Sequence, residues 1–132
     1  MYDSAGLQVL SRDECLKLLA TAAVGRLVYT DKALPVVHPV VFALDGECVV
    51  LRVPDGSATL VARDTIVAFQ IDDVAPDLSR GWSVMAVGHV TEVEEEGRLA
   101  RLERLPLASR GYGDRDRYLV VDLEVLSGRR IP

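Results

Sequence analysis

A short segment near the middle of the chain combines three residue types that bind phosphate groups. Arg52 ends a predicted strand, Gly56 belongs to a predicted turn, and Ser57 stands at the predicted start of a short helix. A cation, a backbone without a side chain and a hydroxyl at a helix start all favour an anion. Residues 51–59 are therefore a candidate phosphate site, although a glycine and a serine after a turn are also the ordinary signature of a helix cap.

Three further side chains could take part in chemistry. His38 shares one face of its predicted strand with apolar residues, where a histidine is either a hydrogen-bonded core residue or a catalyst. Trp82, the single tryptophan, either packs in the core or forms the wall of a site for an aromatic ligand. Arg80 is either solvated or reaches an anion across a dimer interface.

Motifs of side-chain catalysis and of metal binding are absent from the sequence. It contains no nucleophile elbow, P-loop, paired-carboxylate spacing or HExxH, so a cofactor must supply the reactivity if the protein is an enzyme. His38 and His89 are far apart and lack the spacing of metal ligands, so no metal site is predicted. Cys15 and Cys48 have no CxxC partner, and we expect both to be buried reduced thiols.

Composition excludes several classes of protein. The 132 residues are 49% hydrophobic and 27% charged, which predicts one folded domain over residues 1–132 rather than a disordered chain. The net charge is −5 and no basic block occurs, so nucleic acid is not an expected partner. The longest apolar run is too short to cross a bilayer, and the N-terminus resembles no signal peptide. We therefore expect a cytoplasmic protein without a membrane partner.

The elements that would position these residues are mostly strands. Ser11 and Glu14 form a capping box that begins a helix, expected to end near Gly25. Asp45 and Gly46, between two apolar β-branched runs, predict a hairpin with a two-residue turn. Six strands are predicted at residues 26–30, 34–44, 48–53, 66–72, 81–93 and 119–125, with helices near residues 57–63 and 95–105. This order predicts a mainly β fold, an antiparallel six-stranded barrel with two or three short helices. In the last strand the expected inward residues are Leu119, Val121, Leu123 and Val125.

Two of the predicted strands carry additional information. Pro35 and Pro39 have the same parity, so their missing N–H groups leave one strand edge that must be free, bulged or in contact with a ligand. The strand at residues 81–93 is apolar on both faces, with Met85 and Val87 on the face opposite to Trp82. Since few helices are available to cover a second face, we expect a second copy of the chain to cover it in a homodimer.

Seven segments, in order, carry a family resemblance: LSRDECLKLL, VGRLVYT, ALPVVHPVVFALDG, VVLRVPDGS, VAFQIDD, SRGWSVMAVGHVTEV and VVDLEVLSGRRI. Together they resemble the pyridoxamine 5′-phosphate oxidase-like superfamily of flavin-binding split barrels, and within it the small nitroimidazole reductase-like branch. The resemblance covers nearly the whole chain, and its most specific parts are the GWSVMAVG tract and the terminal SGRRI.

This resemblance implies a homodimer with flavin mononucleotide (FMN) at the interface between its subunits. The implied cofactor-binding residues are His38, Val40, Val41 and Phe42 along the flavin ring, Arg52, Val53, Gly56 and Ser57 around the phosphate, and Trp82 at the wall with Arg80 beside it. The implied function is an FMN-dependent oxidoreductase that acts on a small aromatic or nitro acceptor.

Two alternatives stay open. Relatives often have an asparagine at the position of Val41 and a lysine just after the Gly-Ser turn, where this chain has Ala58 and Thr59. The protein could therefore be a reductase that uses the deazaflavin cofactor F420, or a non-catalytic dimer that holds a flavin or another planar ligand. Loops such as residues 108–117 are expected to select the substrate, and their sequence does not identify it.

Overall fold

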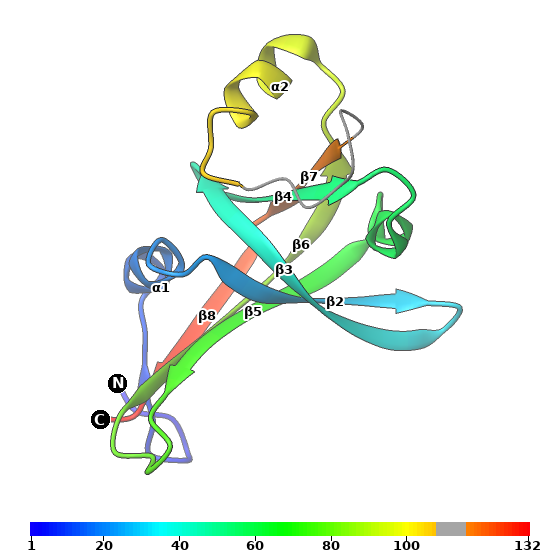
Figure 1. Ribbon diagram of the computed structural model, residues 1–132. Coiled ribbons are helices and arrows are strands. Elements are labelled where there is room, and N and C mark those ends of the chain that lie inside the picture. Colours follow the sequence, from blue (N-terminus) through cyan, green and yellow to red (C-terminus); the bar gives the residue numbers. More distant parts are fainter. Residues whose placement is uncertain (108–115) are drawn as a thin grey trace.

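The computed structural model describes residues 1–107 and 116–132. A closed barrel of antiparallel strands forms its centre, and two further strands extend one side (Figure 1). The strands are β1 (Gln8–Val9), β2 (Val24–Asp31), β3 (Leu34–Asp45), β4 (Cys48–Pro54), β5 (Ile66–Val74), β6 (Gly81–Glu92), β7 (Asp116–Asp122) and β8 (Val125–Arg130), and the helices are α1 (Arg12–Leu19), the 3₁₀ helix η1 (Ala58–Ala62) and α2 (Glu96–Leu102). The predicted mainly β fold, a six-stranded barrel with short helices, is confirmed.

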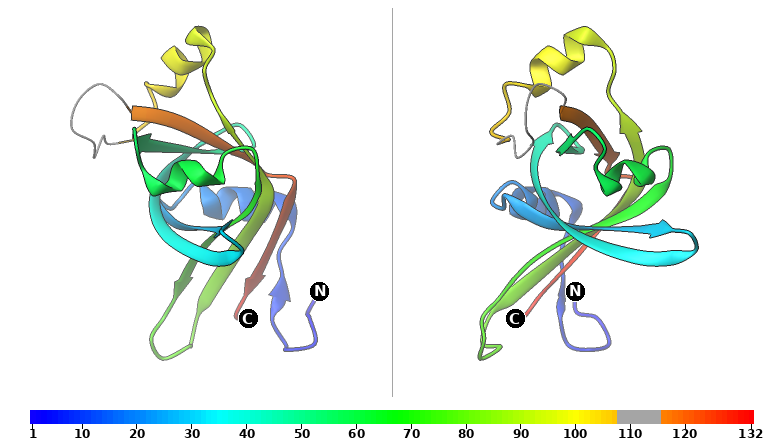
Figure 2. Two further views of the ribbon diagram at one scale, coloured as in Figure 1. Left: turned by 90° about the vertical axis from the view of Figure 1, so that its right-hand side faces the viewer. Right: turned by 45° about the vertical axis from the view of Figure 1, so that its right-hand side comes forward.

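The barrel closes because β6 pairs with two different strands along one edge. The wall runs in the order β6, β5, β2, β3, β4 and β7, and β7 returns to the second half of β6. The first half of β6 pairs with β8 instead, and β1 adds to the outer edge of β8. Figure 2 shows the consequence: β5, β6 and β8 continue below the barrel as an arm that ends near both termini.

Two hydrophobic clusters lie on opposite sides of β4 and β7. The larger cluster fills the barrel and includes the fully buried Leu27, Leu51 and Phe69. The smaller cluster lies under α2 and includes Val50 and Leu102. Because successive strand residues point to opposite faces, β4 and β7 must be apolar on both parities to serve the two clusters.

Helix α1 packs against β8 at the side of the barrel. The Ser11 hydroxyl accepts from the Glu14 backbone N–H, and the Glu14 carboxylate accepts from the Ser11 N–H, which confirms the predicted capping box. Cys15 and Leu19 are buried, and Cys15 lies against Gly128, where a β-carbon would approach the Cys15 sulfur to 2.8 Å. Within the described residues, none of the helices has the length and apolar character needed to span a bilayer.

The predicted strand at residues 119–125 is in fact two strands, β7 and β8, with a bend after Asp122. Gly88 of β6 explains the bend, because a side chain there would overlap the carbonyl oxygen of Asp122. The backbone of β6 at Gly88 lies directly against the backbone at Asp122, and β8 then continues on a different course. Val125 is consequently on the outside and 57% exposed, so its predicted inward position is wrong.

Other predicted bounds differ by a few residues. Helix α1 ends at Leu19 rather than near Gly25, because Gly25 already pairs with Val40 in the β2–β3 ladder. The hairpin between β3 and β4 has the predicted positive φ, +60° at Gly46. Its two loop residues are Gly46 and Glu47, one position later than predicted. Most of the predicted loop at residues 108–117 lies outside the described residues.

Candidate functional site

A cleft beside the predicted phosphate-binding residues lies where β3 and β4 separate. From Asp45–Cys48 to Phe42–Leu51 the two strands pair as a regular hairpin. The next pair in this register would join Val41 to Arg52, but beyond this point β3 pairs with β2 and β4 pairs with β7. The barrel wall is therefore split, and a gap opens between residues 39–41 on one side and residues 52–54 on the other.

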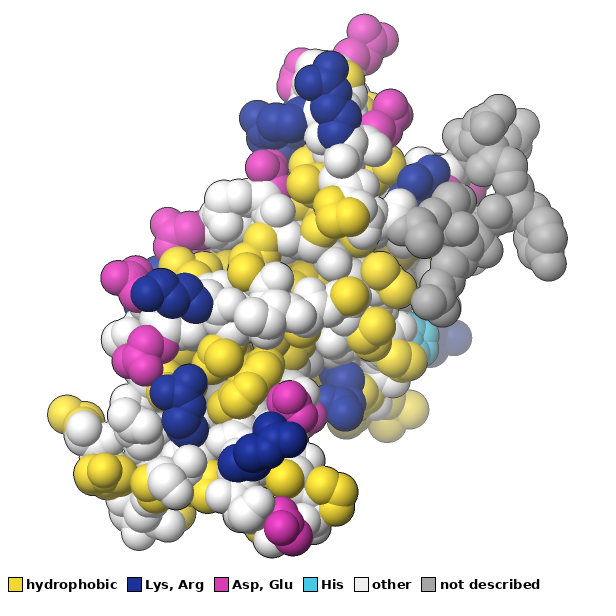
Figure 3. Space-filling view, turned by 60° about the vertical axis from the view of Figure 1, so that its left-hand side comes forward, with side chains coloured by type: hydrophobic (Ala, Val, Ile, Leu, Met, Phe, Trp, Pro, Cys, Tyr) yellow, Lys and Arg dark blue, Asp and Glu magenta, His cyan; other side chains and the backbone are white. Residues whose placement is uncertain are grey.

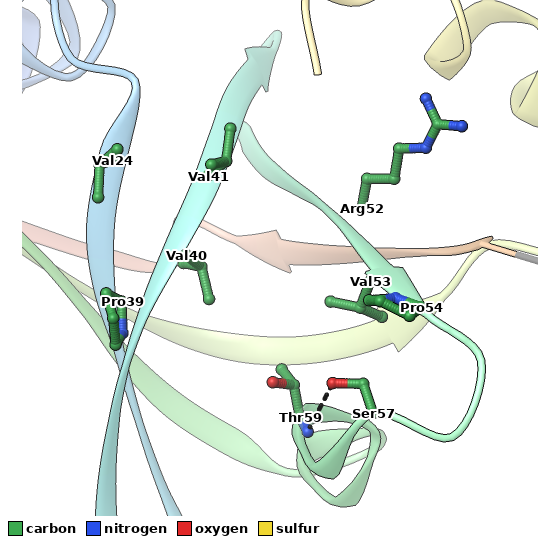
Figure 4. Close-up of a pocket in the computed structure, with 9 residues that line it drawn as sticks. All are labelled: Val24, Pro39, Val40, Val41, Arg52, Val53, Pro54, Ser57 and Thr59. Carbon is green, nitrogen blue, oxygen red and sulfur yellow. Dashed lines mark hydrogen bonds between the residues drawn. The ribbon is translucent and has the colours of Figure 1, made fainter. Parts of the chain in front are cut away.

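This cleft has a volume of about 260 Å³. Figure 4 shows β3 on one side, β4 on the other and η1 at the base. The lining residues are Val24, Pro39, Val40, Val41, Arg52, Val53, Pro54, Ser57 and Thr59. Sites for small ligands usually have roughly 300–1,000 Å³, so a ligand of that size would extend beyond what one chain encloses.

β3 presents an unpaired backbone edge to the cleft. The Phe42 N–H donates to the Ala23 carbonyl on the β2 side, so residues of the same parity turn their backbone groups toward β2. Pro35, Pro39 and Val41 have the opposite parity, and no strand in the described part of the chain pairs with them on that side. The edge predicted from the two prolines is thus a free edge, and its carbonyls and the Val41 N–H can bond to a ligand.

A turn followed by η1 forms the base of the cleft. Gly56 has a φ of +80°, and the Ser57 N–H donates to the Pro54 carbonyl at 3.0 Å, which closes the turn. The Ser57 hydroxyl accepts from the Thr59 N–H at 3.2 Å, so its predicted role as a helix cap is confirmed. Its hydroxyl proton can still be donated to a ligand.

Arg52 lies on the cleft wall, but its guanidinium points away from Ser57 (Figure 4). Its Nε donates to Asp116 at 2.8 Å, and its Nη1 donates to the Leu107 carbonyl at 3.2 Å. The guanidinium carbon also lies 5.7 Å from the centroid of the Tyr118 ring. The structure therefore does not bring together the cation and the hydroxyl of the predicted phosphate site.

His38 belongs to a hydrogen-bonded cluster behind the cleft lining. Its Nδ1 lies 3.2 Å from the Tyr29 hydroxyl and 3.5 Å from the Thr59 hydroxyl, both in buried residues. Burial raises the pKa of Tyr29, so its hydroxyl stays protonated and can donate to the ring nitrogen. His38 is thus a half-buried, hydrogen-bonded histidine that connects β3 to β2 and η1.

The remaining predicted site residues lie elsewhere in the chain. Phe42 is buried in the barrel, where its ring packs edge-on against Phe69 with 4.8 Å between centroids. Gly56 is in the turn but not in the lining. Trp82 lines a separate apolar hollow of about 230 Å³. Arg80 lies just before Trp82, in the loop that joins β5 to β6. This loop is at the far end of β5 from η1 (Figure 1). One chain thus brings Val40, Val41, Val53 and Ser57 to the walls of one cleft together with Arg52, whose guanidinium is turned away from Ser57.

A six-stranded antiparallel barrel whose wall opens between β3 and β4 defines a split-barrel protein. A sequence profile of the pyridoxamine 5′-phosphate oxidase family matches residues 11–130. The chain belongs to this family, and the predicted membership is confirmed.

Individual relatives agree with this assignment. The uncharacterized protein Rv0080 of Mycobacterium tuberculosis is 32% identical over 130 residues, which cover 92% of this chain and 84% of that protein. The FAD binding protein from Mycobacterium smegmatis superposes with a TM-score of 0.82 at 28% identity, covering 95% of this chain and 100% of that one. A candidate 5-nitroimidazole antibiotic resistance protein from Bacteroides thetaiotaomicron shares the fold, with a TM-score of 0.71 at 14% identity and coverage of 95% and 89%.

Some residues of the cleft region could not be recognised in the sequence. Val24 reaches the cleft through its ladder pair with Val41, and Asp116 reaches Arg52 because β7 places it opposite Pro54. Neither residue belongs to a local pattern. Pro39 did offer a signal, because it shares its parity with Pro35 and prolines of one parity in a strand mark an edge that lacks a partner.

Proposed function

We propose that this protein is a flavin-dependent oxidoreductase that binds its cofactor, in the form of FMN, in the cleft between β3 and β4. The free edge of β3 beside apolar side chains carries the proposal. A flavin ring has two apolar faces and a polar pyrimidine edge; Val40, Val41 and Val53 supply apolar contacts, and the exposed backbone of β3 supplies donors and acceptors. Family membership and the FAD-binding relative support a flavin as the ligand.

The described residues fit the flavin ring better than its phosphate. The Ser57 hydroxyl can donate to a phosphate oxygen, whereas the charge of Arg52 is balanced by Asp116. A bound flavin would supply hydride or electron transfer. The residues of this chain would bind the polar edge of the ring, exclude water from part of its surface and fix its orientation. The inferred substrate is a small aromatic or nitro acceptor.

We also infer a homodimer in which the outer face of the sheet is the interface. Five residues form one continuous row across five strands on this face: Val37, Val28, Ala68, Val87 and Val125 are joined pair by pair through the ladders. Val37 and Val125 at its ends are each 57% exposed. Figure 3 likewise shows a face on which hydrophobic side chains gather between charged ones. A second copy covering the row would remove this apolar surface from water and could add Trp82 and Arg80 to the cleft of the first.

The proposed location is the cytoplasm. Cys15 is a buried free thiol, as predicted, whereas Cys48 is a free thiol that is only half-buried and donates to Asp122, so the predicted burial of Cys48 is wrong. Desolvation still raises the pKa of each thiol. Unpaired, weakly ionised thiols are suited to a reducing compartment.

Titration with flavins tests this function. We expect purified protein to quench FMN fluorescence with saturation, and the bound flavin, once reduced, to be reoxidised by a nitroaromatic compound under anaerobic conditions. Riboflavin and the deazaflavin cofactor are titrated in parallel. Binding of the deazaflavin alone would replace FMN by that cofactor, and binding of FMN without reoxidation would leave a flavin-binding protein rather than an oxidoreductase. No binding of any of the three would reject the proposal.

A further inference from the structure

Arg52 is the one cationic residue among the described residues that line the cleft. We propose that Asp116 sets the affinity of the cleft for phosphorylated ligands by holding Arg52 away from them, so that FMN binds as an exchangeable ligand rather than a permanently bound group. This inference rests on the flavin function proposed above. Asp116 would then be a specificity-determining residue, although it lies outside the cleft lining.

Three contacts fix the guanidinium on the side of β4 that faces the cluster under α2. Asp116 accepts from Nε at 2.8 Å, the Leu107 carbonyl accepts from Nη1 at 3.2 Å, and the ring of Tyr118 lies beneath the cation. Tyr118 is part of the cluster under α2. The head group therefore lies on the opposite side of β4 from Ser57, which is the hydroxyl donor at the base of the cleft (Figure 4).

Burial makes this arrangement costly to change. The Asp116 side chain is 7% exposed and the Arg52 side chain 27%. The buried carboxylate loses its charge-assisted hydrogen bond to Nε when Arg52 moves, so a phosphate can recruit Arg52 only by offsetting that loss. The ladder pair between Pro54 and Asp116 also fixes the Asp116 backbone beside β4, which limits how far its carboxylate can follow the guanidinium.

The charge balance leads to the same result. With Arg52 neutralised by Asp116, a phosphate dianion meets no net positive charge among the described lining residues and gains mainly the Ser57 hydroxyl bond. An uncharged ligand end loses nothing in the same position. We therefore expect wild-type protein to bind FMN and riboflavin with dissociation constants within about threefold of each other, since one neutral hydrogen bond contributes little net affinity.

The decisive variant is Asp116→Asn, which removes the negative charge while keeping a hydrogen-bond acceptor. We expect FMN to bind about tenfold more tightly to this variant, because a charge-assisted bond from Arg52 becomes available to the phosphate. Riboflavin affinity should stay unchanged. Asp116→Ser removes the charge as well, and its side chain is too short to reach the guanidinium. It should increase the affinity for FMN at least as much.

Asp122→Asn is the matched control, because this substitution makes the same change in net charge. Asp122 lies at the other end of β7 and is exposed. It should leave both affinities unchanged. Three outcomes would overturn the inference. In Asp116→Asn, the affinities for FMN and riboflavin could change equally, or neither affinity could change; alternatively, the wild-type protein could prefer FMN to riboflavin by more than about thirtyfold. Each outcome means that Asp116 does not withhold Arg52.

Inorganic phosphate separates this inference from the proposed function. If no flavin binds to any variant, the flavin proposal fails, and the thermal unfolding midpoint with and without phosphate then decides about Asp116. If phosphate raises the unfolding midpoint of Asp116→Asn but not that of the wild type or of Asp122→Asn, the result supports the role of Asp116. Equal responses in all three proteins would reject it.

Discussion

Tyr29 of β2 and His38 of β3 form a partly buried hydrogen bond in the wall of the barrel. The Tyr29 side chain is 4% exposed, and its hydroxyl lies 3.2 Å from His38 Nδ1. Rings of the two residues also meet edge to face, with 5.4 Å between centroids. Because a buried hydroxyl needs a partner, the pair fixes the position of β3 relative to β2 just behind the cleft.

The first prediction concerns this pair. Tyr29→Phe removes the hydroxyl that bonds to His38 and should lower the free energy of unfolding by about 1 kcal/mol, as expected for one buried neutral hydrogen bond. Urea denaturation of the two proteins measures the difference. Tyr2→Phe is the control, because Tyr2 is 64% exposed and should tolerate the same change at no cost. If both variants are as stable as wild type, the Tyr29–His38 contact contributes nothing to folding.

At the scale of elements, the start of α1 depends on a carboxylate. Hydrogen bonds from the Ser11 backbone and side chain hold the pKa of Glu14 below its ordinary value of 4.5. Because the pKa of Glu14 is lower in the folded state, the ionised carboxylate stabilises the fold fully at pH values above the ordinary pKa. This stabilisation is lost as the pH falls through the lower pKa of the folded state. The capping box should therefore weaken in acid.

Glu14→Gln tests the pH dependence of the helix cap. Glutamine can still accept from the Ser11 N–H but does not titrate, so the loss of unfolding free energy between neutral pH and about pH 3.5 should be smaller than in wild type. Urea midpoints at both pH values provide the comparison. Ser11→Ala should instead cost about 1 kcal/mol already at neutral pH, since it removes the cap itself. Identical acid sensitivity of wild type and Glu14→Gln would contradict the assignment.

The β3–β4 hairpin provides a prediction about backbone conformation. Gly46 has a φ of +60°, and a β-carbon there would meet no atom within 4 Å, so only the backbone angle restricts the residue. Gly46→Val should lower the free energy of unfolding by roughly 1 kcal/mol or more, whereas Gly46→Asn should cost less because asparagine tolerates this region. Chemical denaturation ranks the three proteins. A valine variant as stable as the asparagine variant would show that the turn adopts another conformation.

The elements differed in how well they could be predicted from the sequence, and the difference has a physical cause. The capping box at Ser11 and the hairpin at Gly46 depend on neighbouring residues, and both occur, with the hairpin loop one position later than predicted. The bend between β7 and β8 depends on Gly88, which is distant in the sequence, so a continuous apolar alternation concealed it. The candidate site divides in the same way: Ser57 was recognisable as a cap, whereas the contact of Arg52 with Asp116 exists only through the β4–β7 ladder.

The whole molecule presents an apolar row from Val37 to Val125 that one chain leaves uncovered. In the proposed dimer, Val87→Glu would place a charge at this interface without a partner, and we expect the protein to become monomeric at micromolar concentration. Sedimentation velocity measures the change. Val61→Glu is the control, because Val61 is 49% exposed on η1, away from the row, and should leave the dimer intact. A wild-type protein that sediments as a stable monomer would reject the dimer.

The two prolines of β3 also bear on how this molecule stays in solution during synthesis and folding. An open strand edge is a template onto which extended segments of other chains can add, and repeated addition leads to fibrils. Pro35 and Pro39 remove two of the N–H groups that such addition would need, on the stretch where β3 has no second neighbour. The edge can therefore stay open for the proposed flavin, while a growing β-sheet finds no continuous row of donors there.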